Sequence, residues 1–126
     1  MFLEHVNLTV TDLDASVAFY CRLFDFRVRW EGKAIGSEGL VRASHVGDDR
    51  VYLALFEAEQ PGAAPLDYGC AGVNHFGFVV EDLDATRRRI AEMGLSPHHD
   101  LAYDPGEHVY VFDPDGIEIE LVRYAA

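Results

Sequence analysis

The sequence predicts an α+β fold made of two βαβββ modules. The main observation is an internal repeat: residues 4–15 and 74–85 align without a gap, so that His75 lies 70 residues after His5. Both copies begin with residues that alternate between apolar and polar, which is typical of a half-buried strand. Both continue with the sequence Asp-Leu-Asp-Ala, in which the first Asp can cap a helix. A repeat of this kind indicates two copies of one structural unit.

A connector separates the copies. Residues 58–72 contain two prolines and three glycines, a density of strand and helix breakers that favours irregular structure. We therefore expect residues 1–126 to form one domain of two modules, at about 1–57 and 73–126.

Each module shows one helix and several strands. In the first, a helix from Leu13 carries apolar residues at steps of three and four, and strands are expected at 4–10, 26–30, 40–46 and 51–56, with 31–36 as a loop. In the second, a helix after Asp82 stops at Gly94. Strands are expected there at 74–80, 97–100, 108–112 and 117–123, and the strand at 97–100 is followed by a loop that runs through 104–106.

The composition and charge of the chain argue against several classes of function. The formal net charge is −12, and Lys33 is the only lysine, which argues against binding to nucleic acid or to an anionic membrane. The N-terminus has no signal-peptide pattern, and no apolar run reaches 18 residues, so we expect a cytoplasmic protein. Cys21 and Cys70 have no metal or redox spacing.

Because side chains alternate along a strand, each predicted strand has one face toward its helix and one face away from it. His5 and His75 both lie on the face of their strand that is opposite to the helix. In the last strand Glu118 and Glu120 point away from the apolar face, toward the side that holds the histidines. Two imidazoles and a carboxylate suit a divalent cation such as Fe(II), Mn(II), Zn(II), Ni(II) or Co(II).

At this point the chain resembles a known family. The His-to-Asp-Leu-Asp start of each half, and Asp113-Pro114-Asp115-Gly116 followed by Glu120, are similar to the vicinal oxygen chelate superfamily of glyoxalases, bleomycin resistance proteins and extradiol dioxygenases. The resemblance implies that the two modules form curved sheets around a cup. It also implies that His5, His75 and Glu120 are the metal ligands, and that the protein is a homodimer.

One position departs from the family pattern. Aligning residues 53–55 with 119–121 places Ala54 opposite Glu120, where glyoxalase I-type members carry a glutamate. A site with two histidines and one carboxylate leaves several coordination positions open, as in non-haem Fe(II) oxygenases. The missing glutamate argues against strict glyoxalase I activity.

Other residues of the cup follow from parity. His108 and Tyr110 are candidate catalytic residues, and we expect Asn7, Tyr52 and Phe56 to contact the substrate. The predicted function is that of a divalent-metal-dependent enzyme, dioxygenase-like, whose small-molecule substrate chelates the metal through neighbouring oxygens. The alternatives are a glyoxalase-like lyase or isomerase of the lactoylglutathione lyase type, and a non-catalytic drug-binding resistance protein.

Overall fold

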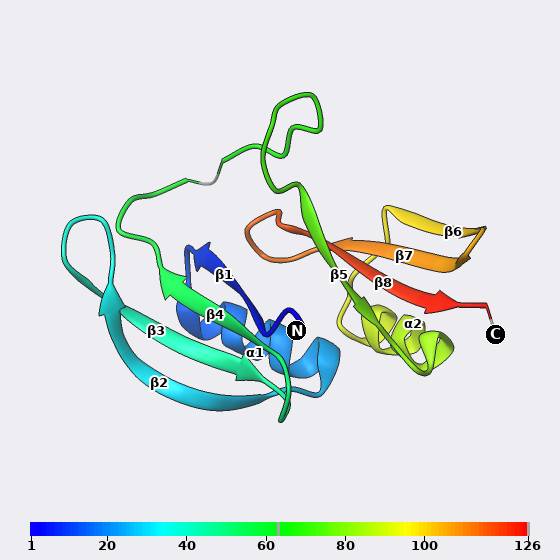
Figure 1. Cartoon of the computed structure of the whole chain (residues 1–126), viewed down its shortest axis with the longest axis horizontal. Coiled ribbons are helices and arrows are strands. Elements are labelled where there is room, and N and C mark those ends of the chain that lie inside the picture. Colours follow the sequence, from blue (N-terminus) through cyan, green and yellow to red (C-terminus); the bar gives the residue numbers. More distant parts are fainter. Residues whose placement is uncertain (63, 126) are drawn as a thin grey trace. The chain divides into compact units, whose positions relative to one another are not determined.

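The structure is a computed structural model that describes residues 1–62 and 64–125. The chain divides into two compact units, Met1–Ala63 and Ala64–Ala126. Each unit contains one helix and one open four-stranded sheet, in the order βαβββ (Figure 1). The predicted α+β fold of two βαβββ modules is therefore confirmed.

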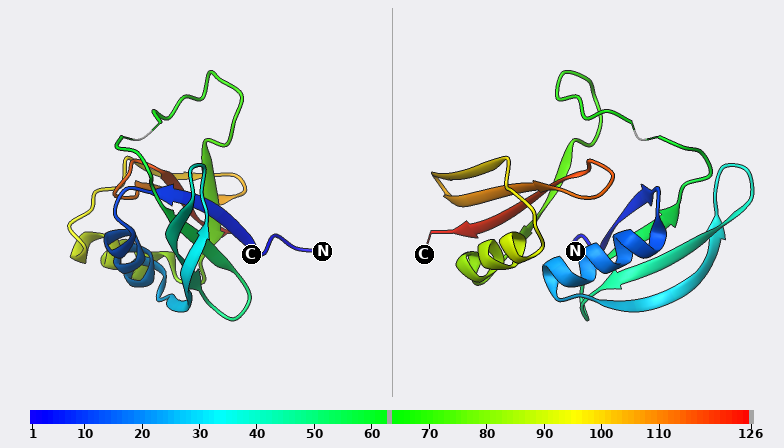
Figure 2. Two further views of the ribbon diagram at one scale, coloured as in Figure 1. Left: turned by 90° about the vertical axis from the view of Figure 1, so that its left-hand side faces the viewer. Right: turned by 180° about the vertical axis from the view of Figure 1, so that it is seen from behind.

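Unit 1 consists of β1 (His5–Val10), α1 (Leu13–Phe24), β2 (Arg27–Ile35), β3 (Leu40–Gly47) and β4 (Tyr52–Glu57). The strands lie in the order β1-β4-β3-β2, with β1 parallel to β4 and the other pairs antiparallel. Helix α1 lies against one face of this sheet (Figure 2). Its first turn is capped by Asp12, whose side chain accepts a hydrogen bond from the Ala15 N–H at 3.0 Å.

Strand β2 is longer than the sequence predicts. Residues 31–35 were expected in a loop, but they pair with residues 40–44 of β3 in a regular antiparallel ladder. Glycines at 32 and 36 suggested a loop, whereas the partner strand supplies hydrogen bonds that local propensity does not describe. The prediction of a loop at 31–36 is wrong for all but Gly36.

Unit 2 consists of β5 (His75–Val79), α2 (Leu83–Glu92), β6 (His99–Tyr103), β7 (Gly106–Phe112) and β8 (Glu118–Tyr124), in the sheet order β5-β8-β7-β6. Asp82 caps α2 by accepting from the Ala85 N–H at 2.8 Å, and Gly94 follows the helix with φ +74°. The turn before β8 is fixed by Asp113, whose Oδ1 accepts from the N–H groups of Asp115 and Ile117 at 2.8 Å each. This turn sets the position at which β8 begins.

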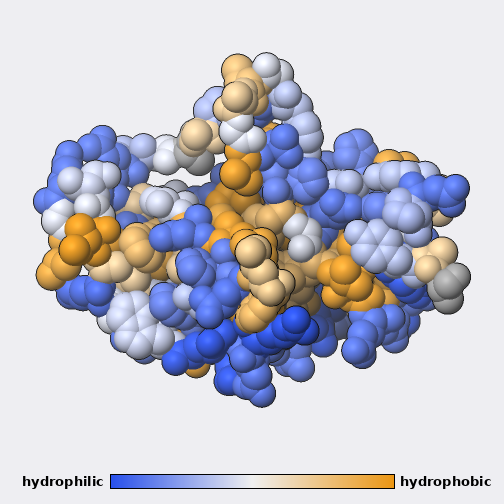
Figure 3. Space-filling model, viewed as in Figure 1, coloured by the Kyte–Doolittle hydropathy of each residue, from blue (hydrophilic) through white to orange (hydrophobic). Residues whose placement is uncertain are grey.

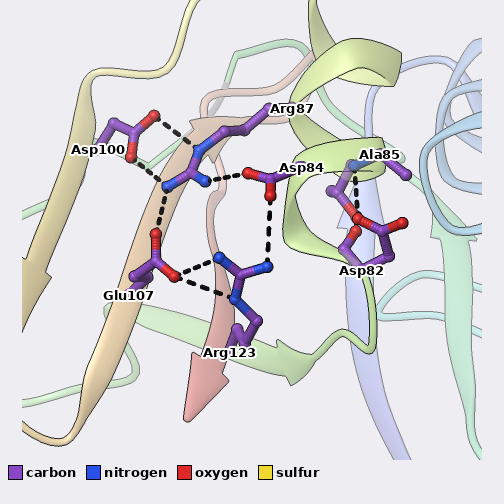
Figure 4. Close-up of polar contacts among 8 residues, drawn as sticks. Asp82, Asp84, Ala85, Arg87, Asp100, Glu107 and Arg123 are labelled. Atoms are coloured by element: carbon purple, nitrogen blue, oxygen red, sulfur yellow. Dashed lines mark hydrogen bonds and ion pairs between the residues drawn. The ribbon is translucent and has the colours of Figure 1, made fainter. Parts of the chain in front are cut away.

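Ion pairs join α2 to the sheet of unit 2 (Figure 4). Arg87 pairs with Asp84 and with Asp100 of β6, in each case at 2.8 Å, and more loosely with Glu107 of β7 at 3.4 Å. Arg123 of β8 pairs with Glu107 and Asp84. The carboxylates around Arg87 raise its pKa above the usual value, and the hydrogen bond with Asp100 is the largest cause. Arg87 is thus engaged within the unit.

Apolar side chains between each helix and its sheet form the cores. In unit 1 the fully buried residues include Val10, Tyr20, Leu23, Val46, Leu53 and Leu55; in unit 2 they include Leu83, Ile90, Val109, Val111, Ile119 and Leu121. Hydrophilic residues make up much of the face seen in Figure 3, in keeping with the acidic composition, and hydrophobic residues also reach the surface there. Among the described residues, neither helix has the length and apolar character needed to cross a bilayer.

Candidate metal centre

In each sheet, one face packs against the helix and the other carries the predicted histidine; we call the second the histidine face. In unit 2, the register pairs His75 with Glu118, and Gly77 with Glu120. On the other side of β8, Tyr110 of β7 pairs with Glu120. Side chains at paired positions lie on the same face. The strand parity inferred from the sequence thus agrees with the register of unit 2.

Glu120 lies between two histidines. Its Oε2 is 3.2 Å from His75 Nε2, and its Oε1 is 2.6 Å from His108 Nδ1. The side chain of Glu120 is 17% exposed and that of His108 only 7%. His108 also stacks on Tyr103, with ring centroids 4.3 Å apart. Glu120 is therefore held from one side by a buried imidazole, while its second oxygen faces His75.

The ring of His75 is oriented by a contact on the side away from Glu120. Its Nδ1 lies 2.7 Å from Asn74 Oδ1, which can only accept a hydrogen bond. In the tautomer with the proton on Nδ1, the lone pair of the ring is on Nε2, the nitrogen that faces Glu120. Histidines that bind metals in proteins commonly donate their other N–H to an oxygen in this way.

The pair of His75 and Glu120 fits a divalent cation. Two ligand atoms about 2.1 Å from an ion and at right angles to each other lie about 3 Å apart. The separation of 3.2 Å between His75 Nε2 and Glu120 Oε2 matches this geometry. The supporting hydrogen bonds to Asn74 and from His108 also correspond to the outer contacts of metal-bound imidazoles and carboxylates. The donor set is suitable for the transition metals that the sequence suggested.

The third predicted ligand, His5, belongs to unit 1. It occupies in β1 the place that His75 occupies in β5, and it stacks on Tyr52 with ring centroids 4.8 Å apart. Its Nδ1 lies 3.1 Å from the carboxylate of Glu4. Within residues 1–62 and 64–125, no group of three His, Cys, Asp or Glu side chains has metal-ligand spacing.

In unit 1, the strand position equivalent to Glu120 is an alanine in the structure, as the sequence alignment indicated. Asn7 pairs with Ala54 in unit 1 as Gly77 pairs with Glu120 in unit 2. Ala54 is therefore the structural equivalent of Glu120. Glu57 lies on the helix side of the sheet, opposite Val10, and forms an ion pair with Arg42.

The remaining predicted residues lie on the histidine faces. Tyr52 and Phe56 of β4 pair with His5 and Thr9 of β1, and Asn7 is exposed between them. In unit 2, burial raises the pKa of Tyr110 above its usual value, and hydrogen bonding with Tyr103 and the charge of Glu120 act in the same direction. The phenol of Tyr110 is thus a neutral donor at physiological pH.

Sequence reasoning missed a second carboxylate cluster in unit 2. Glu118 is 4% exposed, and it accepts hydrogen bonds from Tyr68 of the connector and from His98, whose Nε2 lies 2.8 Å away. Burial alone would raise the pKa of Glu118, but the hydrogen bonds from Tyr68 and His98 outweigh it and lower this pKa. The same hydrogen bond raises the pKa of Tyr68 to about 12. Tyr68 lies in the connector, and His98 lies just before β6 although a strand was expected at 97–100; the contacts of both with Glu118 depend on tertiary packing that no sequence pattern describes.

In unit 1, the sequence did not single out Arg29, His45 or Trp30. The ring of His45 stacks on Tyr52 with centroids 4.4 Å apart. Trp30 contacts His45, and the guanidinium of Arg29 lies over Tyr52 at 4.7 Å. These side chains extend the histidine face of unit 1 across all four strands.

Comparisons with known proteins agree with this architecture. The family model of the Glyoxalase/Bleomycin resistance protein/Dioxygenase superfamily matches residues 2–121. A probable lactoylglutathione lyase of Synechocystis sp. is 28% identical, over 98% of this chain and 95% of that protein. A catechol-2,3-dioxygenase of Bacillus subtilis is 30% identical over 93% of this chain, which covers 39% of that protein.

A solved structure has the same fold. It is that of a mutant of the fosfomycin resistance protein FosX from Listeria monocytogenes, in complex with Mn(II) and 1S,2S-dihydroxypropylphosphonic acid. The TM-score is 0.75 at 21% identity, and the match covers 96% of this chain and 90% of that one. From the family match and the two βαβββ units, the chain belongs to the Glyoxalase/Bleomycin resistance protein/Dioxygenase superfamily, within the vicinal oxygen chelate proteins.

Proposed function

We propose that the protein is a divalent-metal-dependent enzyme in which His5, His75 and Glu120 bind one ion of Fe(II), Mn(II), Zn(II), Ni(II) or Co(II). The observation that carries the proposal is the 3.2 Å approach of His75 Nε2 to Glu120 Oε2, with both side chains fixed from behind by hydrogen bonds. His5 occupies the equivalent position in the repeated unit and would supply the third ligand. Mn(II) in the FosX complex supports a metal in this fold.

The alanine at position 54 determines which chemistry is favoured. With only three protein ligands, coordination positions remain for two neighbouring oxygens of a substrate and for a further small molecule such as O2. We therefore propose a dioxygenase-like reaction on a substrate with vicinal oxygens, in which a carbon–carbon bond opens and both atoms of O2 enter the product. The relative named catechol-2,3-dioxygenase supports this choice.

A bound metal would supply a Lewis acid and a template that orients the substrate. The chain itself contributes the rest. His108 holds the carboxylate of Glu120 in place through Nδ1. Tyr110, whose pKa is raised by burial, can donate a hydrogen bond to an oxygen that gains negative charge. Tyr52 and Phe56 provide apolar surface, and Asn7 a polar contact, on the histidine face of unit 1.

A lyase or isomerase activity is the second candidate. It is favoured by the relative named probable lactoylglutathione lyase, of which this chain covers 95%. It is disfavoured because the carboxylate that could move a proton is replaced by the methyl group of Ala54. His108 would then have to serve as the base, although it already contacts Glu120.

Metal analysis followed by activity assays tests the proposal. We expect protein purified without added metal to contain about one equivalent of a transition metal, and the variants His5→Ala, His75→Ala and Glu120→Ala to lose it. The matched control is His99→Ala, an exposed histidine of β6 with no carboxylate contact among the described residues.

The activity assay separates the candidates. Oxygen uptake with a catechol and Fe(II) supports the dioxygenase-like reaction, and turnover of a thiol hemiacetal with Ni(II) or Zn(II) supports the lyase. Full metal content in all three ligand variants would overturn the metal centre. A metal-free protein that binds a planar drug tightly would indicate the non-catalytic alternative.

A further inference from the structure

The histidine face of unit 1 carries a row of aromatic rings. The row runs from His5 on β1 to Tyr52 on β4, His45 on β3 and Trp30 on β2, which is the order of the strands in the sheet. Consecutive ring centroids lie 4.8, 4.4 and 4.9 Å apart. The rings of His5, Tyr52 and His45 stack on one another, so the row offers mainly ring edges to a ligand, and edge-to-face contacts of this kind suit a flat aromatic ring.

A β-bulge creates the far end of this row. Val28 pairs with Val46, but the next pair is Trp30 with His45, so Arg29 is an extra residue with no partner in the ladder. Without the bulge, the alternation of β2 would direct Arg29 and Trp30 to opposite faces. With it, the guanidinium of Arg29 lies over Tyr52 while Trp30 contacts His45, so both reach the same face. Bulges often redirect side chains beside functional sites.

Gly32 helps to hold Trp30 in this position. The ring of Trp30 lies along β2, directly over Gly32, where a Cβ would stand 2.5 Å from the Cζ2 atom of the indole. Any side chain at position 32 would displace the ring. Absence of a side chain therefore keeps the indole flat against its own strand.

Arg29 differs from the other arginines that reach the faces of the two sheets. Arg27, Arg42, Arg87 and Arg123 each form an ion pair with a carboxylate. Arg29 has no such ion pair among the described residues, and its one ring contact is with Tyr52. The positive charge of Arg29 lowers the pKa of Asp48, but the carboxylate of Asp48 accepts its hydrogen bonds from the backbone N–H groups of Arg50 and Val51, at 2.8 Å each.

The chemistry of a stacked guanidinium points to its ligand. When the flat face of an arginine rests on an aromatic ring, its N–H groups still lie in the plane and can bind a carboxylate through two parallel hydrogen bonds. The net charge of −12 repels anions in general, so an anionic ligand needs a local cation. Arg29 is such a cation, and it stands beside the rings.

We propose that the histidine face of unit 1 binds a planar aromatic carboxylate, with its ring against Tyr52, His45 and Trp30 and its carboxylate on Arg29. This inference rests on the proposed function in one respect: His5, at the other end of the row, is a proposed metal ligand. The substrate class is thus a compact aromatic acid that also carries two neighbouring oxygens. Its diol binds the metal, and its acid group binds Arg29.

Trp30 allows a direct test because it is the only tryptophan in the chain. Its fluorescence reports binding at this face, and isothermal titration calorimetry gives an independent affinity. The probes are benzoate (acid without diol), catechol (diol without acid) and 3,4-dihydroxybenzoate (both). Each is titrated into metal-loaded protein and into protein stripped with EDTA.

We expect benzoate to bind the stripped protein and to change the Trp30 emission. In Arg29→Met the affinity for benzoate should fall about tenfold or more, because a charge-assisted bidentate contact is lost. Arg29→Lys should give an intermediate loss. The matched control is Arg27→Met, which removes an arginine two residues away that pairs with Asp49; it should bind benzoate like the wild type. Melting temperatures confirm that each variant folds.

The inference would be overturned if benzoate does not bind, or if Arg29→Met does not weaken its binding. The metal centre is tested separately by catechol. Catechol binding that requires metal, together with benzoate binding that does not, supports both proposals. Benzoate binding that depends on Arg29 in a protein that never takes up metal would uphold this inference and reject the proposed function.

Discussion

Ala54 of β4 and Glu120 of β8 occupy the same position in the two repeated units. Each lies on the histidine face, two pairs along the ladder from the histidine-bearing pair of its own unit. One copy of the repeat thus retains a carboxylate where the other has a methyl group. In the proposed metal centre, this difference would make unit 2 the source of the anionic ligand.

Restoring a carboxylate at this position should make stability depend on metal. Without metal, Ala54→Glu should lower the free energy of unfolding by at least about 2 kcal/mol, because it places a charge at a buried position. Added Zn(II) or Ni(II) should raise its melting temperature more than that of the wild type, because binding stabilises the folded state. Thermal unfolding with and without metal measures both effects.

The control for this variant is Ala43→Glu. Ala43 is a buried alanine on the same face of unit 1, paired with Phe56 and Gly32 rather than next to the proposed ligands. It should be destabilised without any recovery on adding metal. Equal recovery in both variants, or in neither, would contradict the assigned position of Ala54.

His108 should act on the metal through Glu120. His108→Phe keeps a ring that can stack on Tyr103 but loses the donor to Glu120, so we expect metal affinity to fall about 10- to 100-fold. His108→Asn places an amide nitrogen near the position of Nδ1 and should recover part of this loss. Competition with a chromophoric chelator measures the affinities. A structural role alone would instead make the two variants equally weak, in proportion to their loss of stability.

Tyr68 should titrate late. Its hydrogen bond to Glu118 raises its pKa to about 12. Since the folded pKa lies above the unfolded value of about 10, the hydrogen bond contributes fully to stability below pH 10. That contribution is lost as the pH rises from about 10 to 12. Titration of Tyr Cζ by NMR should show a signal with a pKa of about 12 that is missing in Tyr68→Phe, whereas the signal of Tyr110, whose pKa is also raised, should remain.

Glu118→Gln should shift that signal toward pH 10, because the amide carries no charge. Tyr124→Phe is a suitable control, because Tyr124 is an exposed tyrosine at the end of β8. If the late signal persists in Glu118→Gln, a cause other than the Glu118 carboxylate controls the titration of Tyr68.

The ion pairs of Arg87 should contribute modestly to the stability of unit 2. The Arg87 side chain is 27% exposed, so its pairs are partly screened by water. Arg87→Ala should lower the free energy of unfolding by about 1 kcal/mol in low salt and by less in 0.5 M NaCl. Arg88→Ala, which alters the exposed neighbour on α2, should change little. Urea denaturation at the two salt concentrations would show whether the difference is electrostatic.

The repeat and its strand parity predicted much of this architecture. The alignment of His5 with His75 located both first strands, and alternation in β8 placed Glu120 on the face of His75, where the two side chains meet. These inferences succeed because a regular strand has a fixed period of two. The sharing of a metal with His5 stays a prediction.

Other features could not be predicted because they break local rules. The bulge beside Arg29 interrupts the period of two, so parity assigned from the sequence cannot place Arg29 and Trp30 together. Tyr68 and His98 lie outside regular strands, and their contacts with Glu118 depend on tertiary packing. Residues 31–35 were misassigned because Gly32 suggested a turn, whereas its lack of a side chain accommodates the Trp30 ring.

The pairing of β2 with β3 is complete without Arg29. A chain shortened by that one residue could join Val28 directly to Trp30, and every other pair from Arg27 to Ile35 would keep its present partner. Position 29 therefore contributes no pair to this ladder. A related chain could therefore gain or lose a positive charge beside these rings through the insertion or deletion of one codon, while the proposed metal ligands stay as they are.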